Sequence, residues 1–484
     1  MLYGLLRLVG GVALRWYYRS ITTTGLERIP RGGPVFLAVN HPNALVDAMV
    51  VGWCAPRRVR FTAKATLFAN PLVARCLTGV GVVPLRRASD EGAGSSGGAI
   101  DLSRNQASFD AVARALAAGS AVVIFPEGKS HDDPKLAPLR TGLARMALHA
   151  YTELGVTGLR VVPVGLLFEH KEQPRSRILL QVGEPLEFDA LPVGQRTVAA
   201  MTQLVATRLA AVTLNFASAE DAERLQLVGR TLAALLDPPP TLGEGETPLA
   251  RTLAIVRRLD RGLASVRAQG DAALEARASA FEARVRRFRA DLDARRLDVH
   301  DVGISAAAAP GMRFAVREAL LAGLLAPVGL WGRITHVLPI QLARRLALRN
   351  VRSRDEPAMN TLVIGLILVL VAYGAQTTLV WLIAGPWWAA AFLLTLVPSA
   401  SSDLRYGDRT RRARARARAY FTYRRNPSLQ QALLAEADAI RQEAGQLEQL
   451  TAAPGVTYGG TSKGGTSNGG TPNGGREHDG METV

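Results

Sequence analysis

Short apolar runs alternate with helix-like stretches between Gly33 and Asp189, and this alternation limits the possible folds more than any other feature. The runs have the length and the Val, Ile and Leu content of strands that are buried on both faces. Strands that alternate with helices in this way form a mainly parallel sheet flanked by helices, so the sequence predicts an α/β domain. The predicted strands are Val35–Val39, Ala121–Phe125, Val161–Phe168 and Ile178–Val182, and two predicted helices are Phe109–Ala118 and Gly142–Leu154.

The composition limits both the partners and the chemistry. With 484 residues, 48% of them hydrophobic, the chain has room for two or three domains and a membrane segment. Its formal net charge of +17 indicates an anionic partner, either nucleic acid or anionic lipid. The two cysteines, Cys54 and Cys76, provide no disulfide framework, which suits a reducing cytosolic face. Neither they nor the seven histidines show metal-ligand spacing, so we expect no metal and no bound cofactor.

Residues 1–20 mix apolar side chains with three arginines. No small-residue cleavage site follows a basic start, so we do not expect a signal peptide. The apolar stretch is also too short to span a bilayer, which needs about 20 apolar residues. An amphipathic helix on the membrane and a buried first helix of the domain both fit this segment.

The sequence becomes helical and rich in Ala, Arg and Leu from about Glu220 to Asp298. Its apolar spacing predicts an antiparallel helix pair, and we assign its arginines to a solvated face. Pro238–Pro240 is a predicted linker, and Gly92–Gly98 a predicted mobile loop in the α/β domain. The final residues repeat a Gly-Gly-Thr unit without apolar content, which predicts a disordered tail.

Thr361–Val397 is the most apolar segment and carries no charged residue. It is longer than one ordinary span and shorter than two, at about 17–25 residues each. Arginines flank it on both sides, and the positive-inside rule then favours both flanks in the cytoplasm. A hairpin that turns near Gln376–Thr378 or near Gly385–Pro386 satisfies this rule. A single span over Asn360–Ala384 and a buried soluble helix pair are the alternatives, and Glu318–Trp331 is a further apolar stretch for the interface.

Seven arginines between Arg405 and Arg418 supply much of the excess charge. Beside a membrane, each contributes roughly 1 kcal/mol of attraction to anionic lipid. Nucleic-acid binding would need a recognisable fold or stacking aromatic residues among the charges. Tyr420, Phe421 and Tyr423 lie nearby, but they suit the bilayer interface equally well. We therefore predict membrane lipids as partners and no nucleic acid, with the protein at the cell membrane and its α/β domain facing the cytoplasm.

His41 and Asp47 lie in a polar segment after a predicted strand. A histidine has a pKa near neutrality, so it can remove a proton from an alcohol that attacks a carbonyl. A nearby carboxylate can hold the imidazole in the right tautomer and stabilise its charged form. Pro42 can start a helix, and six helical residues turn through roughly 600°, so His41 must reach back from the loop for the pair to form. A polar loop without chemistry is the alternative.

Several further residues favour a phosphorylated ligand. Glu127 follows a predicted strand, at the position where functional groups gather in α/β folds. Gly128 lets the backbone approach a ligand closely, and Lys129 is a cation beside it. Arg140 stands just before a predicted helix, and residues 81–87 end in two more arginines. A base and several cations in one domain indicate a phosphorylated alcohol as the acceptor.

Four segments, taken together, resemble the phospholipid/glycerol acyltransferase (PlsC-like) family, which includes glycerol-3-phosphate and lysophosphatidate acyltransferases. They are residues 40–47, 81–87, 125–128 and 161–165, and the resemblance covers about residues 20–190. It implies an acyltransferase fold and catalytic roles for the first segment. It also implies that the second and third segments bind the acceptor and that the fourth binds the acyl donor or packs.

The chain departs from the common family pattern at two places. Five residues rather than four separate His41 from Asp47, and Lys129-Ser130-His131 stands where Thr-Arg usually follows the Pro-Glu-Gly turn. Both departures resemble the subgroup of fungal-type glycerol-3-phosphate and dihydroxyacetone-phosphate acyltransferases. That subgroup also carries a long C-terminal extension with membrane segments.

These observations predict an O-acyltransferase that moves a fatty acyl group from acyl-CoA or acyl-carrier protein to glycerol 3-phosphate or 1-acylglycerol 3-phosphate. The predicted catalytic residues are His41 and Asp47, and the predicted acceptor-binding residues are Arg87, Glu127, Gly128, Lys129 and Arg140. A dihydroxyacetone-phosphate or lysophospholipid acyltransferase and a non-catalytic lipid-binding scaffold are the alternatives. We interpret His131 as a loop residue without a chemical role, with a phosphate ligand as the alternative, and His149 and His170 as structural.

The predicted order of domains places the acyltransferase domain between membrane-associated parts. The segments are a membrane-associated helix (1–20), the α/β acyltransferase domain (21–200), a helical region (201–305), a membrane-associated region with the hairpin at about 361–397 and its polybasic flank (306–425), a helix (426–450) and a disordered tail (451–484).

Overall fold

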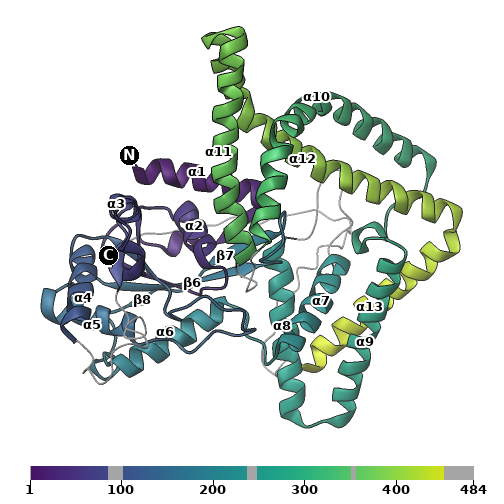
Figure 1. Ribbon diagram of the computed structural model, residues 1–484. Coiled ribbons are helices and arrows are strands. Elements are labelled where there is room, and N and C mark those ends of the chain that lie inside the picture. Colours follow the sequence, from purple (N-terminus) through teal and green to yellow (C-terminus); the bar gives the residue numbers. More distant parts are fainter. Residues whose placement is uncertain (1, 86–101, 237–247, 350–355, 452–484) are drawn as a thin grey trace, which may run out of the picture.

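The computed structural model describes residues 2–85, 102–236, 248–349 and 356–451. An α/β domain is followed by a helical region, and long helices run along one side of the molecule (Figure 1). The predicted linker at Pro238–Pro240, the predicted mobile loop at Gly92–Gly98 and the predicted disordered tail lie outside the described residues, apart from the first residue of the tail.

The α/β domain contains, in chain order, α1 (Leu2–Tyr17), β1 (Ser20–Thr24), η1 (Leu26–Arg28), β2 (Val35–Val39), α2 (Ala44–Cys54), β3 (Val59–Lys64), η2 (Ala65–Phe68), α3 (Pro71–Val80), β4 (Val83–Leu85), α4 (Leu102–Ala117), β5 (Ala121–Ile124), α5 (Gly142–Leu154), β6 (Arg160–Phe168), β7 (Arg177–Val182), β8 (Leu186–Glu187), η4 (Val193–Gln195) and α6 (Val198–Val212). The helical part contains α7 (Ala219–Leu236), α8 (Leu249–Gln269), α9 (Ala272–Ala294), η5 (Val299–Asp301), α10 (Ala308–Ala347), α11 (Glu356–Ala384), α12 (Pro386–Arg425) and α13 (Pro427–Thr451).

Among the described residues, eight strands form one sheet in the order β1-β7-β6-β2-β5-β3-β4, with β8 paired to β6. The pairs are parallel except for β6 with β7 and β6 with β8. The predicted mainly parallel sheet with flanking helices is therefore confirmed. The four predicted strands are β2, β5, β6 and β7, with ends that differ by one residue at most.

The two faces of the central strand β2 pack against different helices. Val35, Leu37 and Val39 belong to a cluster that includes residues of α1 and α2. Phe36 and Ala38 belong to a second cluster with residues of α4, α5 and α6. Successive side chains of a strand point to opposite faces, so a strand buried on both faces reads as one continuous apolar run. This packing explains why β2 carries no alternation of polar and apolar residues.

Three loops meet at one edge of the sheet. Strand β2 lies between β5 and β6 and is parallel to both. The carboxyl ends of these three strands therefore lie at the same edge. The loops that begin at Asn40, Phe125 and Glu169 follow directly from them. The polar residues of three distant sequence segments are brought together here.

The predicted helix pair is present as α8 and α9 (lower right in Figure 1). Gly270 ends α8 with a φ of 65°, and the Asp271 side chain caps the first turn of α9. Residues of α7, α9, the end of α12 and α13 share a separate apolar core. The helical region therefore has its own core beside the α/β domain.

Two described helices are apolar and long enough to cross a membrane, by length and composition: α10 and residues 357–384 of α11. They indicate that the protein associates with membranes. The chain turns at Gly385, with a φ of 90°, which is the second of the two predicted turn positions. The structure differs from the prediction in two ways. Residues 318–331 belong to the long α10, and the returning helix α12 is not itself among the candidate spans.

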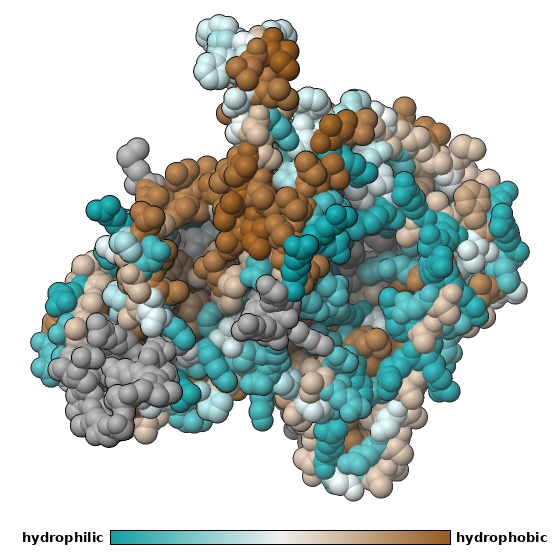
Figure 2. Space-filling view, in the orientation of Figure 1, coloured by the Kyte–Doolittle hydropathy of each residue, from teal (hydrophilic) through white to brown (hydrophobic). Residues whose placement is uncertain are grey.

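Helix α11 is rooted in the α/β domain. Ala358 and Leu362, near its start, are buried in the cluster that includes α1 and α2. Beyond this base, α11 projects from the molecule (Figure 1), and Figure 2 shows apolar surface over much of its length, with less hydrophobic residues at the tip. Its exposed apolar side chains are Val363, Ile367, Leu370, Val371, Leu379, Trp381, Leu382 and Ile383.

Helix α1 combines both interpretations that its sequence allows. Its first half exposes Leu2, Leu5, Leu6 and Leu8, as a helix on a membrane surface would. Its second half buries Leu14 and, at the end, Tyr17 against the sheet.

The arginine-rich part of α12 is partly engaged within the molecule. Arg409 forms two hydrogen bonds of 2.8 Å with Glu318 of α10. Arg411 pairs with Asp408, and Arg416 lies 3.5 Å from Asp301. Arg409 and Arg416 thus join α12 to α10 and η5, whereas Arg411 pairs within α12. The sequence analysis does not foresee these contacts.

Candidate active site

His41 and Asp47 form a hydrogen-bonded pair at the edge of the sheet. The His41 Nδ1 atom lies 2.9 Å from Asp47 Oδ2. The Asp47 side chain is fully buried, whereas the His41 side chain is 18% exposed. The His41 ring stacks on Phe125, with ring centroids 4.1 Å apart. Because Nδ1 faces the carboxylate, Nε2 is the ring nitrogen left to meet a substrate.

The local backbone explains how the pair forms across six residues. Helix α2 begins at Ala44 rather than at Pro42, so the expected helix start was wrong by two residues. Asp47 consequently lies in the first turn of α2, and His41 reaches it from the loop. Ala44 has a φ of 46°, in the left-handed region, which costs a non-glycine residue roughly 1–2 kcal/mol. Its N–H donates to Ser130 Oγ (3.1 Å), a contact that supports this conformation.

Burial dominates the electrostatics of the pair. It raises the pKa of the Asp47 carboxyl, while the hydrogen bond to His41 and the N–H of Asn43 act in the opposite direction. The Asn43 N–H donates to Asp47 Oδ2 at 2.7 Å. The second oxygen, Oδ1, has no hydrogen-bond partner among the described residues. The carboxylate is thus fixed through one oxygen, the one that faces the imidazole.

Glu127 is turned into the protein. Its Oε1 accepts the backbone N–H of His41 at 2.8 Å. Its Oε2 accepts the N–H of Ala137 at 2.9 Å and contacts His131 Nε2. The residue is only 3% exposed. Both carboxylate oxygens of Glu127 therefore bind groups of the protein itself. The family resemblance implies that Glu127 binds the acceptor, but these contacts do not direct either oxygen toward an acceptor.

The other predicted acceptor-binding residues lie beside Glu127, with one exception. Gly128 has a φ of 80°, and a Cβ there would lie 3.2 Å from Arg140 Cγ. The Arg140 backbone is held by Pro126 through a 2.7 Å hydrogen bond. The side chains of Lys129 and Arg140 are exposed, and both are available to an anion. Arg87 lies outside the described residues.

Lys171 is a site residue that the sequence analysis does not identify. Its Nζ donates to the carbonyls of Pro42 (2.9 Å) and His131 (3.3 Å), and it pairs with Asp132. It therefore joins the loop of His41 to the loop of His131. Lys171 follows β6, and only the strand order, which places β6 beside β2, brings it here. In the sequence, the only indication that Lys171 belongs to the site was its position shortly after a buried strand.

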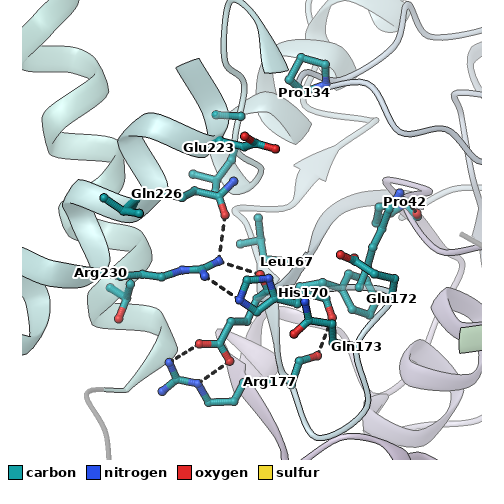
Figure 3. A pocket seen from close by; sticks show the side chains of 18 of the residues that line it. Pro42, Pro134, Leu167, His170, Glu172, Gln173, Arg177, Glu223, Gln226 and Arg230 are labelled. Carbon is teal, nitrogen blue, oxygen red and sulfur yellow. Dashed lines mark hydrogen bonds and ion pairs between the residues drawn. The ribbon is translucent and has the colours of Figure 1, made fainter. Parts of the chain in front are cut away.

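A cavity of about 920 Å³ adjoins these loops and extends to α7 (Figure 3). Asn40, Pro42, Glu127 and His131 line it on the side of the sheet. The remainder of the lining mixes apolar residues with charged residues of both signs, so the cavity has no single charge character.

On the opposite side of this cavity, Arg230 of α7 forms hydrogen bonds to the loop that follows β6. It reaches toward the loop after β6 in Figure 3 and donates to His170 Nε2 and to the Glu169 carbonyl, both at 2.7 Å. Burial and the Arg230 charge lower the pKa of His170. His170 thus accepts a hydrogen bond that links two parts of the molecule. This contact agrees with its interpretation as a structural residue.

A histidine with an orienting carboxylate, placed where parallel strands end, defines a site for acid–base chemistry on an alcohol. Residues 20–167 match the protein family described as Acyltransferase, so this part of the chain is an acyltransferase-family domain. The resemblance in the motifs is therefore confirmed at the level of the family.

Two curated relatives agree with this assignment, and one solved structure is similar over part of the chain. Glycerol-3-phosphate O-acyltransferase 2 of Saccharomyces cerevisiae is 42% identical over 85 residues, 18% of this chain and 11% of the relative. A chloroplastic 1-acyl-sn-glycerol-3-phosphate acyltransferase of Arabidopsis thaliana is 25% identical over 171 residues, 35% of this chain and 41% of the relative. The crystal structure of the 1-acyl-sn-glycerophosphate acyltransferase PlsC from Thermotoga maritima is 18% identical with a TM-score of 0.33, and the match covers 43% of this chain and 77% of that chain. The chain spans less than half the length of the curated relatives that it matches.

Proposed function

We propose that this protein is a membrane-bound O-acyltransferase that transfers a fatty acyl group from a thioester to a hydroxyl of a glycerol phosphate. The observation that carries the proposal is the 2.9 Å contact between His41 Nδ1 and the buried Asp47 carboxylate, inside an acyltransferase-family domain. The donor is acyl-CoA or acyl-carrier protein. No metal or bound cofactor takes part in the proposal.

The proposed mechanism uses the substrate alcohol as the nucleophile. His41 Nε2 removes the hydroxyl proton while the hydroxyl oxygen attacks the thioester carbonyl. The Asp47 carboxylate holds Nδ1–H and stabilises the imidazolium that forms. Collapse of the tetrahedral intermediate breaks the C–S bond, and His41 returns the proton to the leaving thiolate. The products are the acyl ester and the free thiol, and no enzyme serine is acylated.

The proposed acceptors are glycerol 3-phosphate and 1-acylglycerol 3-phosphate. Relatives in Saccharomyces cerevisiae and Arabidopsis thaliana are named for these two acceptors. Lys129 and Arg140 are exposed cations on either side of Gly128, Lys129 as the next residue and Arg140 by packing against it. They are proposed, with Arg87, to bind the acceptor phosphate.

The protein is proposed to sit at the cell membrane with its acyltransferase domain in the cytoplasm. The base of α11 is buried in that domain, and α12 returns from Gly385 to place its arginines near the domain again. Both charged flanks of the apolar hairpin then lie on the same side, as the positive-inside rule favours.

The decisive test is an acyl-transfer assay with the purified full chain in detergent. Acyl-CoA or acyl-carrier protein is offered with glycerol 3-phosphate, 1-acylglycerol 3-phosphate, dihydroxyacetone phosphate or a lysophospholipid, and the products are measured by mass spectrometry. We expect transfer to a glycerol phosphate, and we expect His41→Ala to abolish it. Equal transfer by the wild type and His41→Ala would refute the mechanism. Preference for another acceptor would revise the substrate, and no transfer to any acceptor would favour a lipid-binding scaffold.

A further inference from the structure

Glu127 connects His41 to a second histidine. One carboxylate oxygen holds the backbone N–H of His41 at 2.8 Å, and the other contacts His131 Nε2 and accepts the N–H of Ala137. The side chains of His131 and Glu127 are 11% and 1% exposed. A carboxylate so deeply buried needs hydrogen bonds or an opposite charge to remain stable there. His131 supplies the only imidazole partner of Glu127 among the described residues.

The remaining contacts fix how His131 is oriented. Its Nδ1 accepts the backbone N–H of Asp133 at 3.2 Å. Because an imidazole nitrogen that accepts carries no proton, the proton of the neutral ring lies on Nε2, which faces Glu127. On the other side of the loop, Lys171 Nζ donates to the His131 carbonyl and to the Pro42 carbonyl. The loop of His131 is thus joined to the loop that carries His41 through Glu127, through Lys171 and through the contact of Ser130 with Ala44.

We propose that His131 is a positioning residue for the acyl-transfer reaction: it holds Glu127, and Glu127 holds the backbone of His41. In this arrangement His131 and Glu127 together set the distance between His41 Nε2 and the acceptor hydroxyl. Neither of these two residues contacts the acceptor. An error of about 1 Å in the place of a catalytic group costs on the order of 100-fold in rate. The inference rests on the proposed acyl transfer and adds a role for a residue outside the His41–Asp47 pair.

The test separates positioning from binding by its effect on kcat and on KM. His131→Ala removes the contact with Glu127, and His131→Gln keeps a side-chain N–H donor. We expect His131→Ala to lower kcat about 100-fold while KM for the acceptor changes less than about twofold. We expect His131→Gln to recover at least about tenfold of the lost kcat, because its amide N–H can replace the donor at Nε2.

His149 provides a matched control. Its Nε2 lies 2.7 Å from Asp110, and its side chain is 12% exposed, so it forms a similar histidine–carboxylate pair in the same domain. It joins α5 to α4, away from the site. We expect His149→Ala and His149→Gln to leave kcat and KM unchanged. Thermal unfolding of all four variants shows whether each is folded under the assay conditions.

Two kinetic results would overturn the inference. A rise in acceptor KM with unchanged kcat in His131→Ala would make His131 an acceptor-binding residue, and unchanged kcat and KM in His131→Ala would leave it without a role. Nuclear magnetic resonance of the His41 ring tests the same contact without turnover. The His41 imidazole shifts should move in His131→Ala and stay in place in His149→Ala; no movement in His131→Ala would also reject the inference. If the wild type transfers no acyl group, the proposed function is refuted. The His41 chemical shifts would still test whether His131 acts on His41 through Glu127.

Discussion

Asp47 is deeply buried, and both of its hydrogen bonds are made through one carboxylate oxygen. The residue is fully buried, and burial raises the pKa of its carboxyl. The carboxylate would therefore destabilise the fold if its only task were structural, because a buried ionised group costs free energy unless it is well paired. Its Oδ2 faces His41 and the Asn43 N–H, and its Oδ1 has no partner among the described residues. A buried carboxylate whose bonded oxygen faces an imidazole is suited to hold that imidazole in one orientation, as the proposed mechanism requires.

The Asp47→Asn variant separates activity from stability. An amide cannot stabilise the imidazolium as a carboxylate does, so we expect kcat to fall on the order of 10³–10⁴-fold. Because the pKa of Asp47 is raised in the folded state, the wild type loses stability as pH rises through the range between the usual and the raised pKa. Asp47→Asn lacks this loss. The unfolding free energy of the variant minus that of the wild type should therefore increase as pH rises through the same range. Denaturant unfolding at several pH values and steady-state kinetics measure both effects; retained kcat would contradict the role of Asp47.

At the scale of residues, the sequence allowed most of the site residues to be named, but it did not allow the direction of every side chain to be predicted. The pairing of His41 with Asp47 followed from chemistry, and the structure contains it. The inward direction of Glu127 did not follow, because its partners at His41 and Ala137 are backbone groups of separate loops. Their placement depends on the strand order of the sheet, and no local pattern encodes that order.

At the scale of elements, η5 and α12 meet through a buried carboxyl. Asp301 is 4% exposed and lies 3.5 Å from Arg416. Burial and the nearby Asp298 raise the pKa of Asp301 to about 6, and Arg416 acts against this shift. The arginine-rich helix therefore packs on a group that is neutral at mildly acid pH.

The Asp301→Asn variant tests this junction by its pH dependence. The folded pKa lies above the usual value near 4, so ionisation destabilises the folded state, and stability is lost as pH rises from about 4 to 6. A shift of about two units corresponds to roughly 2–3 kcal/mol. We expect the difference in unfolding free energy, wild type minus Asp301→Asn, to fall by about this amount over that range. Denaturant titrations at pH 4, 5, 6 and 7 measure it, and parallel pH profiles for the two proteins would rule out the raised pKa.

Strands marked by a continuous apolar run could be predicted from the sequence. The start of α2 and the full length of α10 could not. The apolar runs gave β2, β5, β6 and β7 to within a residue at each end. The start of α2 differed, because Ala44 takes a left-handed conformation that its residue type disfavours. Helix α10 continues through Pro327 and Pro339, where proline argues for a break. Such prolines are tolerated in membrane helices when neighbouring groups satisfy the freed carbonyls.

At the scale of the whole molecule, the loop after β6 connects the catalytic edge to the long helices. Arg175, with a φ of 66°, donates to the Trp16 carbonyl at 3.3 Å and pairs with Asp408 of α12. The Trp16 indole N–H donates to Ser401 Oγ, also in α12, at 3.0 Å. Together with the buried base of α11, these contacts fix the acyltransferase domain against the apolar helices. The sequence predicted the apolar hairpin but not these ties, which join residues more than 150 positions apart.

These ties make the surface of α11 the part to test for membrane insertion. Leu370 and Val371 are 56% and 63% exposed near the middle of α11. A deletion of the whole apolar stretch would also remove the buried Leu362, so a point substitution is the cleaner experiment. An aspartate near the centre of a span costs roughly 3 kcal/mol. We expect Leu370→Asp, and more strongly the double variant with Val371→Asp, to move protein from the membrane pellet to the soluble fraction after alkaline extraction.

The control is Leu450→Asp on α13, which is 51% exposed and outside the candidate spans. We expect it to stay in the pellet with the wild type, because its new charge remains in water. Acyl transfer in detergent should be the same in all these variants, since the side chains of Leu370 and Val371 are exposed and outside the apolar cluster of the α/β domain. If Leu370→Asp with Val371→Asp remained wholly in the pellet, the exposed face of α11 would not lie in the bilayer. The exposed leucines of α1 and the candidate span α10 would then remain as anchors, and the double variant Leu5→Asp with Leu8→Asp would test α1.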